Sequence, residues 1–151
     1  MKRLRAVINS SLWGQMTDIL LRPARPGDSD SLKHLLDRSW RAHWAPHLDV
    51  GAWARYDAAQ PAIGYVDAYL GDFVVAERGG VVVGMYHLEE SMLHAIHVDS
   101  WAIGTGIGSV LMGAAEAAGA GRLEVRAFNA RARAFYQRRG WQEMDDYADT
   151  E

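Results

Sequence analysis

Residues 98–109 read Val-Asp-Ser-Trp-Ala-Ile-Gly-Thr-Gly-Ile-Gly-Ser, so three glycines lie close together between a predicted strand and a predicted helix. Because glycine has no Cβ, main-chain amides in such a segment can approach an anion closely. The N-terminus of the following helix adds partial positive charge. A turn that only requires positive φ angles is the simpler alternative. The favoured interpretation is a binding turn for a phosphate or pyrophosphate.

Glycine spacing narrows the class of phosphate ligand. A dinucleotide-binding turn has glycines at its first, third and sixth positions, and counted from Gly104 the sixth position is Ser109. A nucleotide P-loop needs a lysine before its Ser or Thr, whereas Ser109 directly follows Gly108. The spacing therefore disfavours nucleoside triphosphates and a dinucleotide-binding oxidoreductase.

Hydrophobic periodicity predicts the elements on both sides of this turn. Strands are expected at residues 19–21, 73–77, 81–88, 92–98 and 122–128, with a last strand around Trp141. Helices are expected from Leu32 to His43 behind an N-cap at Asp28, and over residues 49–60, 107–118 and 130–139. Antiparallel strands thus precede a strand-helix-strand unit, and the predicted fold class is α/β with a mixed (α+β) sheet.

Composition indicates one domain and excludes several classes of function. A length of 151 residues with 49% hydrophobic and 23% charged residues suits a single core. Residues 1–15 lack a clear period, so we expect an N-terminal extension followed by a single domain over residues 16–151. The absence of cysteine excludes disulfides and a cysteine acyl-enzyme.

Charge and hydropathy bear on partners and location. A net charge of -3 gives no reason to expect nucleic acid as a partner. No apolar run approaches the roughly 20 residues that cross a bilayer, and the basic start at Lys2, Arg3 and Arg5 is not followed by the apolar core of a signal peptide. The expectation is a cytoplasmic protein without a membrane partner.

Two motifs resemble those of the GNAT superfamily of N-acetyltransferases. The run from Ile103 to Gly108 is similar to the family's pyrophosphate turn, with Gly106 and Gly108 at its fixed positions and Ile103 where the family usually has Arg or Gln. The run from Asn129 to Trp141 is similar to the family's second signature. That signature matches at Asn129, Ala132, Phe135, Tyr136, Gly140 and Trp141. The resemblance extends from about Ile19 to Trp141.

This resemblance implies an acetyl-CoA dependent N-acetyltransferase, in which a primary amine attacks the thioester directly through a tetrahedral intermediate. Tyr136 is then the acid that protonates the departing thiolate, although a core aromatic is the alternative. Main-chain amides of the strand before the turn would hold the pantetheine arm and the oxyanion. The cofactor-binding residues expected are Ile96, His97, Val98, Ile103, Gly104, Thr105, Gly106, Ile107, Gly108, Ser109, Asn129 and Tyr136.

The general base is expected among the residues of the 81–98 hairpin. His87, Glu89, Glu90 and His94 are candidates without ranking, and a solvated turn is the alternative role of the two glutamates. His94 and His97 are three residues apart on a predicted strand, which predicts that they point to opposite faces. No pair resembles a metal-binding motif, so no metal is expected.

The acceptor is expected to be a small-molecule or peptide amine. Aromatic residues of the first two predicted helices could box an ammonium group, and the loop from His43 to Leu48 is the preferred part. These residues are Trp40, His43, Trp44, His47, Trp53 and Tyr56. A noncatalytic acyl-CoA binding or sensing protein is the alternative function, and a homodimer is compatible with the sequence.

Overall fold

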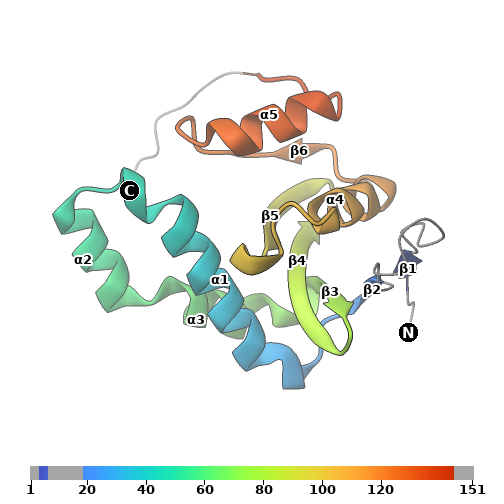
Figure 1. Ribbon diagram of the computed structural model, residues 1–151, viewed down its shortest axis with the longest axis horizontal. Coiled ribbons are helices and arrows are strands. Elements are labelled where there is room, and N and C mark those ends of the chain that lie inside the picture. Colours follow the sequence, from blue (N-terminus) through green and yellow to red (C-terminus); the bar gives the residue numbers. More distant parts are fainter. Residues whose placement is uncertain (1–3, 7–18, 145–151) are drawn as a thin grey trace.

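The computed structural model describes residues 4–6 and 19–144. They form one mixed sheet with helices on both of its faces (Figure 1). The strands are β1 (Leu4–Ala6), β2 (Ile19–Pro23), β3 (Phe73–Arg78), β4 (Val81–Glu89), β5 (Met92–Val98) and β6 (Arg122–Leu123). The α-helices are α1 (Ser29–His43), α2 (Val50–Ala59), α3 (Pro61–Tyr69), α4 (Ile107–Ala117) and α5 (Ala130–Arg138). Short 3-10 turns are η1 (Pro26–Asp28), η2 (Ala45–His47), η3 (Leu70–Asp72) and η4 (Ser100–Ala102).

The sheet follows the order of the chain from β1 to β6. Strands β1 to β5 pair antiparallel, and only β6 joins its neighbour β5 in parallel. Helix α4 makes the connection between these two parallel strands. The predicted fold class, antiparallel strands followed by a strand-helix-strand unit, is confirmed.

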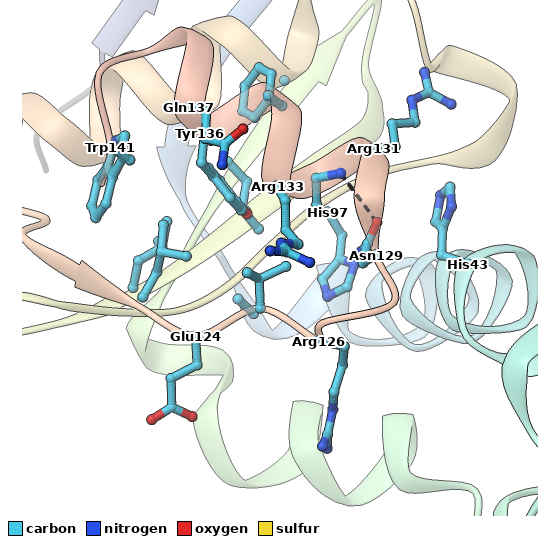
Figure 2. A pocket seen from close by; sticks show the side chains of 18 of the residues that line it. His43, His97, Glu124, Arg126, Asn129, Arg131, Arg133, Tyr136, Gln137 and Trp141 are labelled. Atoms are coloured by element: carbon cyan, nitrogen blue, oxygen red, sulfur yellow. Dashed lines mark hydrogen bonds between the residues drawn. The ribbon is translucent and has the colours of Figure 1, made fainter. Parts of the chain in front are cut away.

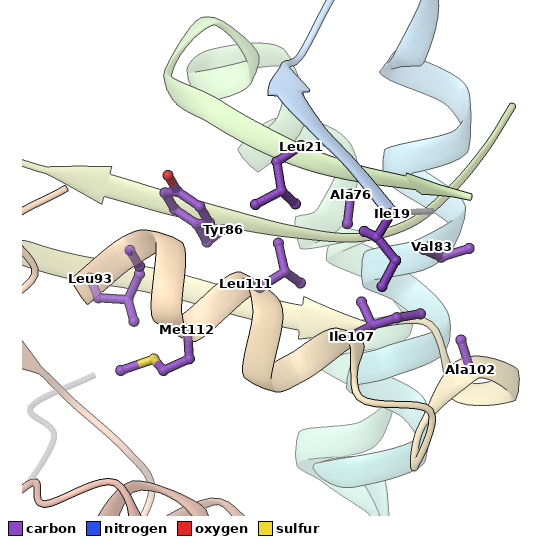
Figure 3. Packing of buried hydrophobic residues seen from close by; sticks show 11 residues of the cluster. Ile19, Leu21, Ala76, Val83, Tyr86, Leu93, Ala102, Ile107, Leu111 and Met112 are labelled. Atoms are coloured by element: carbon purple, nitrogen blue, oxygen red, sulfur yellow. The ribbon is translucent and has the colours of Figure 1, made fainter. Parts of the chain in front are cut away.

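Neighbouring strand residues point to opposite faces and build two cores. Val75 packs with α1 and α3, whereas Ala76 packs with α4. The first core consists of Leu32, Leu35, Leu36, Val66, Phe73, Val75 and Met85. The second core, shown in Figure 3, consists of Ile19, Leu21, Ala76, Val83, Tyr86, Leu93, Ala102, Ile107, Leu111, Met112 and Ala115. Helix α5 lies on the same side as α4, because Phe135 and Tyr136 pack against this second core.

Helix α4 lies so close to β4 that only glycine fits at the contact. A Cβ on Gly84 would lie 2.7 Å from Leu111 Cδ1 and 3.0 Å from the His97 carbonyl oxygen. Since α4 begins at the glycine turn, this close contact also fixes the position of that turn against the sheet.

A buried arginine ties β2 to the start of α1. The Arg22 guanidinium donates to both carboxylate oxygens of Asp28, at 2.7 and 2.9 Å, and to Glu77 at 2.7 Å. These hydrogen bonds lower the pKa of Asp28 and raise that of Arg22. Asp28 does occupy the predicted N-cap position, but its carboxylate bonds Arg22 and the Arg25 amide and makes no cap bond to α1.

Two predicted strands differ from the structure. Only Arg122–Leu123 of the stretch 122–128 joins the sheet, because residues 124–128 turn away from β5. Residues 141–144 carry no strand, and residues 145–151 lie outside the described part of the chain. Within the expected extension, Leu4–Ala6 pair with Ile19–Leu21, while residues 1–3 and 7–15 also lie outside the described part.

Candidate functional site

A large cleft opens at the point where two parallel strands separate. Strand β6 pairs with β5 only through Met92–Arg122 and Leu93–Leu123. Beyond these pairs the strands diverge, and a cleft of about 1510 Å³ lies between β5, the glycine turn and α5. The edge of β5 that faces this cleft has no further strand partner among the described residues. It can therefore pair with an extended ligand that carries amide groups.

The glycine turn forms one end of the cleft. Gly104 and Gly106 have φ angles of 84° and 86°, which favour glycine strongly. Gly106 is the N-cap position of α4, no side chain caps that helix, and its first turn holds no acidic residue. The first amides of α4 therefore lack helical partners, and the turn provides the features that anion binding requires.

Most of the predicted turn residues line the cleft, but two do not. The lining residues are Ile103, Gly104, Gly106, Gly108 and Ser109. The Ile107 side chain is fully buried in the second core, so only its main chain is available to a ligand. The Thr105 hydroxyl donates to the Ala102 carbonyl and so shapes the turn.

Helix α5 supplies the opposite wall. Figure 2 shows Tyr136 extending from α5 into the cleft. Burial raises the pKa of Tyr136 to about 12, so the phenol stays protonated at neutral pH. Asn129 also lines the cleft, and its Oδ1 accepts from the Ala132 amide at 3.2 Å, which confirms its predicted position as the helix cap. The cleft thus has a turn suited to binding an anion on one side and a protonated phenol on the other.

Main-chain groups and a histidine of β5 lie between these walls. Ile96, His97 and Val98 all line the cleft. Nδ1 of His97 lies 2.8 Å from the Ser39 hydroxyl of α1. Burial, with the nearby His43, lowers the pKa of His97 to about 4, and burial with the nearby Arg131 lowers that of His43. Both imidazoles are therefore neutral at pH 7.

Sequence reasoning assigned only the main chain of His97 and missed Ser39. One signal was present, because Ser39 is a polar residue on the apolar face that carries Leu35 and Leu36. A buried serine at such a position needs a hydrogen-bond partner. The partner could not be identified from the sequence.

The predicted opposite orientation of His94 and His97 is wrong. The register between β4 and β5 shifts at His87 and Leu88, so His94 is an extra residue in a β-bulge. Its ring lies 4.8 Å from that of His87, on the face covered by α1 and α3 where His97 bonds Ser39. Because the bulge adds one residue to β5, side chains on its two sides no longer follow the simple alternation between faces that the prediction assumed.

The carboxylates proposed as bases lie at the turn between β4 and β5. Glu89 and Glu90 both line the cleft, and Glu90 has a φ of 55°. Oε2 of Glu89 lies 3.5 Å from Nε2 of His94. They stand at the start of β5, roughly 20 Å along this strand from the glycine turn at about 3.3 Å per residue. His87 is buried and its Nδ1 lies 2.5 Å from the Tyr65 hydroxyl, so it does not line the cleft.

The predicted aromatic box is not formed as a set. Trp40, Trp53 and Tyr56 stack on one another, and Arg41 lies 4.9 Å from the centre of the Trp53 ring. These rings therefore pack α1 against α2 and do not line the cleft. Of the six residues, only His43 and Trp44 line it. His47 stacks on Phe128, which joins the loop after α1 to the loop before α5.

The described part of the chain has neither a metal-binding cluster nor a membrane-spanning helix. Residues 4–6 and 19–144 hold no group of three or more His, Asp or Glu side chains arranged to hold a metal ion. In the same part of the chain, every helix is too short or too polar to cross a membrane.

Comparison with known proteins gives one family match. The family model for an acetyltransferase (GNAT) domain matches residues 70–143, which include the glycine turn and the segment from Asn129 to Trp141. No curated protein sequence matches the chain significantly.

Several solved structures share the fold. The PaiA N-acetyltransferase of Thermoplasma acidophilum, in complex with coenzyme A, is 18% identical with a TM-score of 0.67 over 85% of this chain and 92% of that chain. A GCN5-related N-acetyltransferase from Ralstonia eutropha is 19% identical, with a TM-score of 0.64 over 88% and 98% of the two chains. An aminoglycoside N-acetyltransferase in complex with CoA is 15% identical, with a TM-score of 0.64 over 93% and 98%. The family match identifies a GNAT acetyltransferase domain at residues 70–143, and the fold of the described residues is the one that GNAT acetyltransferases share.

Proposed function

We propose that the protein transfers an acetyl group from acetyl-CoA to a primary amine by direct attack. The observation that carries this proposal is a single cleft with an uncapped helix N-terminus at one end and the protonated phenol of Tyr136 in its wall. Two structures of the same fold were solved with coenzyme A bound, which supports the same cosubstrate here.

Acetyl-CoA would be held mainly by main-chain groups. The amides from Gly104 to Ser109 would bind the pyrophosphate, since Ile103 offers no polar side chain at the position where the family usually has one. The free edge of β5, from Ile96 to Val98, would pair with the amides of the pantetheine arm. Asn129 would contact that arm while it also caps α5.

The reaction then needs two proton transfers. The neutral amine nitrogen attacks the thioester carbon, and main-chain amides of residues 96–98 would stabilise the oxyanion of the tetrahedral intermediate. When the carbon–sulfur bond breaks, the CoA thiolate takes a proton from Tyr136. The phenol carries its proton at neutral pH, as this role requires.

The amine proton requires a base, since an alkylamine of the lysine type has a pKa of about 10.4. We assign this role to Glu89 ahead of Glu90, acting through water in the cleft, because Glu89 pairs with Met92 and lies about 10 Å along β5 from Ile96. Its neighbour His94 can pass the proton on to solvent. Glu90 occupies the left-handed position of the turn and has no such neighbour among the contacts of the described residues.

A panel of amines incubated with acetyl-CoA tests the proposal. The release of free CoA and the mass of the acetylated product are both measured. Equal amounts of CoA and N-acetylated product are expected with at least one amine. Binding of acetyl-CoA without product from any amine would favour the alternative of a noncatalytic acyl-CoA binding protein.

A further inference from the structure

The side chain of His97 leaves β5 in the middle of the segment proposed to hold the acetyl group. Its main chain lies between Ile96 and Val98 on the free edge of β5, and its imidazole lines the cleft (Figure 2). Nδ1 faces α1, where it lies 2.8 Å from the Ser39 hydroxyl. Nε2 makes no hydrogen bond within residues 4–6 and 19–144, and it is not enclosed by protein atoms. This second nitrogen is therefore available to a ligand in the cleft.

The Ser39 hydroxyl determines which nitrogen of His97 carries the hydrogen. Ser39 is buried, so its hydroxyl needs a partner within the protein. Nδ1 of His97 is the only hydrogen-bond acceptor that the described part of the chain offers to this hydroxyl. A buried hydroxyl hydrogen without an acceptor is unfavourable, so the hydroxyl donates to Nδ1. A neutral imidazole has one ring N–H, which then lies on Nε2. His97 thus presents a hydrogen-bond donor to the cleft.

This donor is neutral and held in place. Burial, with the nearby His43, lowers the pKa of His97 to about 4, so the imidazole is uncharged at pH 7. Arg38, which directly precedes Ser39 in α1, donates at 3.0 and 2.6 Å to the two carboxylate oxygens of Asp99, a buried residue just after β5. This ion pair fixes α1 against the end of β5 beside the bond between Ser39 and His97. A donor that is already oriented in this way can stabilise developing negative charge with little reorganisation.

From this arrangement we propose that the Nε2–H of His97 donates a hydrogen bond to the acetyl oxygen, beside the main-chain amides of residues 96–98. The inference rests on the proposed acetyl transfer and assigns a further catalytic residue to it. As the amine nitrogen bonds to the carbonyl carbon, one electron pair of the C=O bond moves to the oxygen, and the hydrogen bond from Nε2 becomes stronger. His97 keeps its hydrogen when the carbon–sulfur bond breaks, because Tyr136 supplies the proton for the thiolate. A base in this place would instead need a lone pair on Nε2.

Two replacements of His97 separate this role from a structural one. Asn places its amide near the position of Nδ1 and can keep the bond to Ser39, whereas Gln reaches the position of Nε2 and can keep the donor. With an amine that the panel identifies, His97→Asn should lower kcat by about 10²- to 10³-fold, the usual effect of losing an oxyanion donor, with KM for acetyl-CoA unchanged. His97→Gln should recover about tenfold or more of that loss, because its amide can still donate. His34→Asn, on α1 outside the cleft, should keep the kcat of the parent.

The pH profile of kcat adds a second readout. It should keep the parent's shape in His97→Asn and His97→Gln, since His97 exchanges no proton in the proposed step. A His97→Asn protein that is as active as His97→Gln, or more active, would show that the bond to Ser39 matters and the donor does not. Loss of a limb of the pH profile in both variants would make His97 a base. Either result overturns the inference.

NMR spectroscopy of the protein with ¹⁵N-labelled histidines tests the inference without turnover, and His97→Asn identifies the signals of His97. Nε2 should carry the hydrogen. Its signals should shift more with the ketone analogue of acetyl-CoA, in which a methylene group replaces the sulfur, than with free CoA, because only the analogue has the carbonyl oxygen. This result supports the inference even if acetyl transfer to every amine fails. A hydrogen on Nδ1, or equal shifts with the two ligands, overturns it.

Discussion

The Ser39 hydroxyl lies 2.8 Å from Nδ1 of His97, so a buried serine of α1 holds an imidazole of β5 at the wall of the cleft. The two residues are 58 positions apart in the chain. Burial, with the nearby His43, lowers the pKa of His97 to about 4. His97 is therefore a neutral hydrogen-bonding group in the folded protein, although it is positively charged at pH 5 in the unfolded chain.

This pKa predicts how stability depends on pH. An unfolded histidine titrates near 6.5, so between about pH 6.5 and 4 the unfolded state binds a proton that folded His97 does not. Stability is therefore lost as pH falls through that window and is unaffected by His97 above it. In His97→Gln, the melting temperature should fall less between pH 7 and 4.5 than in the parent. Ser39→Ala, which keeps the imidazole, should retain the parent's slope. Parallel curves for the parent and His97→Gln would show that His97 titrates normally.

Gly84→Ala should destabilise the protein by about 1–3 kcal/mol, the usual cost of overpacking a core. The new Cβ would meet both a side chain of α4 and the main chain of β5, at 2.7 and 3.0 Å. Urea unfolding measures the change. Gly71→Ala is the matched control, since a Cβ at that position meets nothing within 4 Å. A Gly84→Ala protein as stable as this control would show that α4 can move away from β4 without cost.

Some of this structure could be predicted from the sequence because local chemistry determines it. Helix α4 has apolar residues at the helical period, and its N-cap Gly106 has a positive φ. The turn at Gly79 and Gly80, with φ angles of 59° and 81°, follows in the same way from two glycines between β-branched runs. In each example the signal lies within a few residues of the feature.

Other features depend on contacts between distant segments. The bulge at His94 is one residue in the pairing of two strands, and no residue type at that position requires it. Trp40 stacks on Tyr56 because α1 and α2 pack together, and this removes both rings from the cleft. Arg122 to Phe128 alternates like a strand, yet residues beyond Leu123 line a cleft instead of pairing with β5. An alternating sequence indicates that one set of side chains faces the protein and the other faces away from it. Pairing in a sheet is only one arrangement that produces this pattern.

Gly106→Val should abolish the stabilisation of the protein by acetyl-CoA. Acetyl-CoA at 100 times its Kd should stabilise the parent by about 2.7 kcal/mol in a thermal-shift titration, whereas NAD should give no shift. Valine at Gly106 blocks approach to the turn and strains a φ of 86°. Gly140→Val is the control, because it places the same residue at a φ of 90° outside the cleft. If both variants respond to acetyl-CoA like the parent, the turn does not bind it.

Glu89→Gln should slow acetyl transfer by about 10²- to 10⁴-fold, the usual effect of removing a general base. Loss of the base should matter less at high pH, where more of the amine is already neutral, so the deficit should shrink as pH rises. Glu90→Gln, one residue away in the same turn, should retain most of the activity. Equal and small effects of the two variants would remove both carboxylates from the proton transfer.

Transfer of an isotope-labelled acetyl group from CoA to the amine nitrogen, compared between the parent and Tyr136→Phe, tests the proposed reaction most directly. The phenylalanine ring preserves the packing against Trp141 and removes only the hydroxyl. The parent should form labelled amide, and the variant should form it about 10²- to 10⁴-fold more slowly with unchanged affinity for acetyl-CoA. A parent that binds acetyl-CoA and labels no amine, or a Tyr136→Phe protein that labels the amine as fast as the parent, would contradict the account.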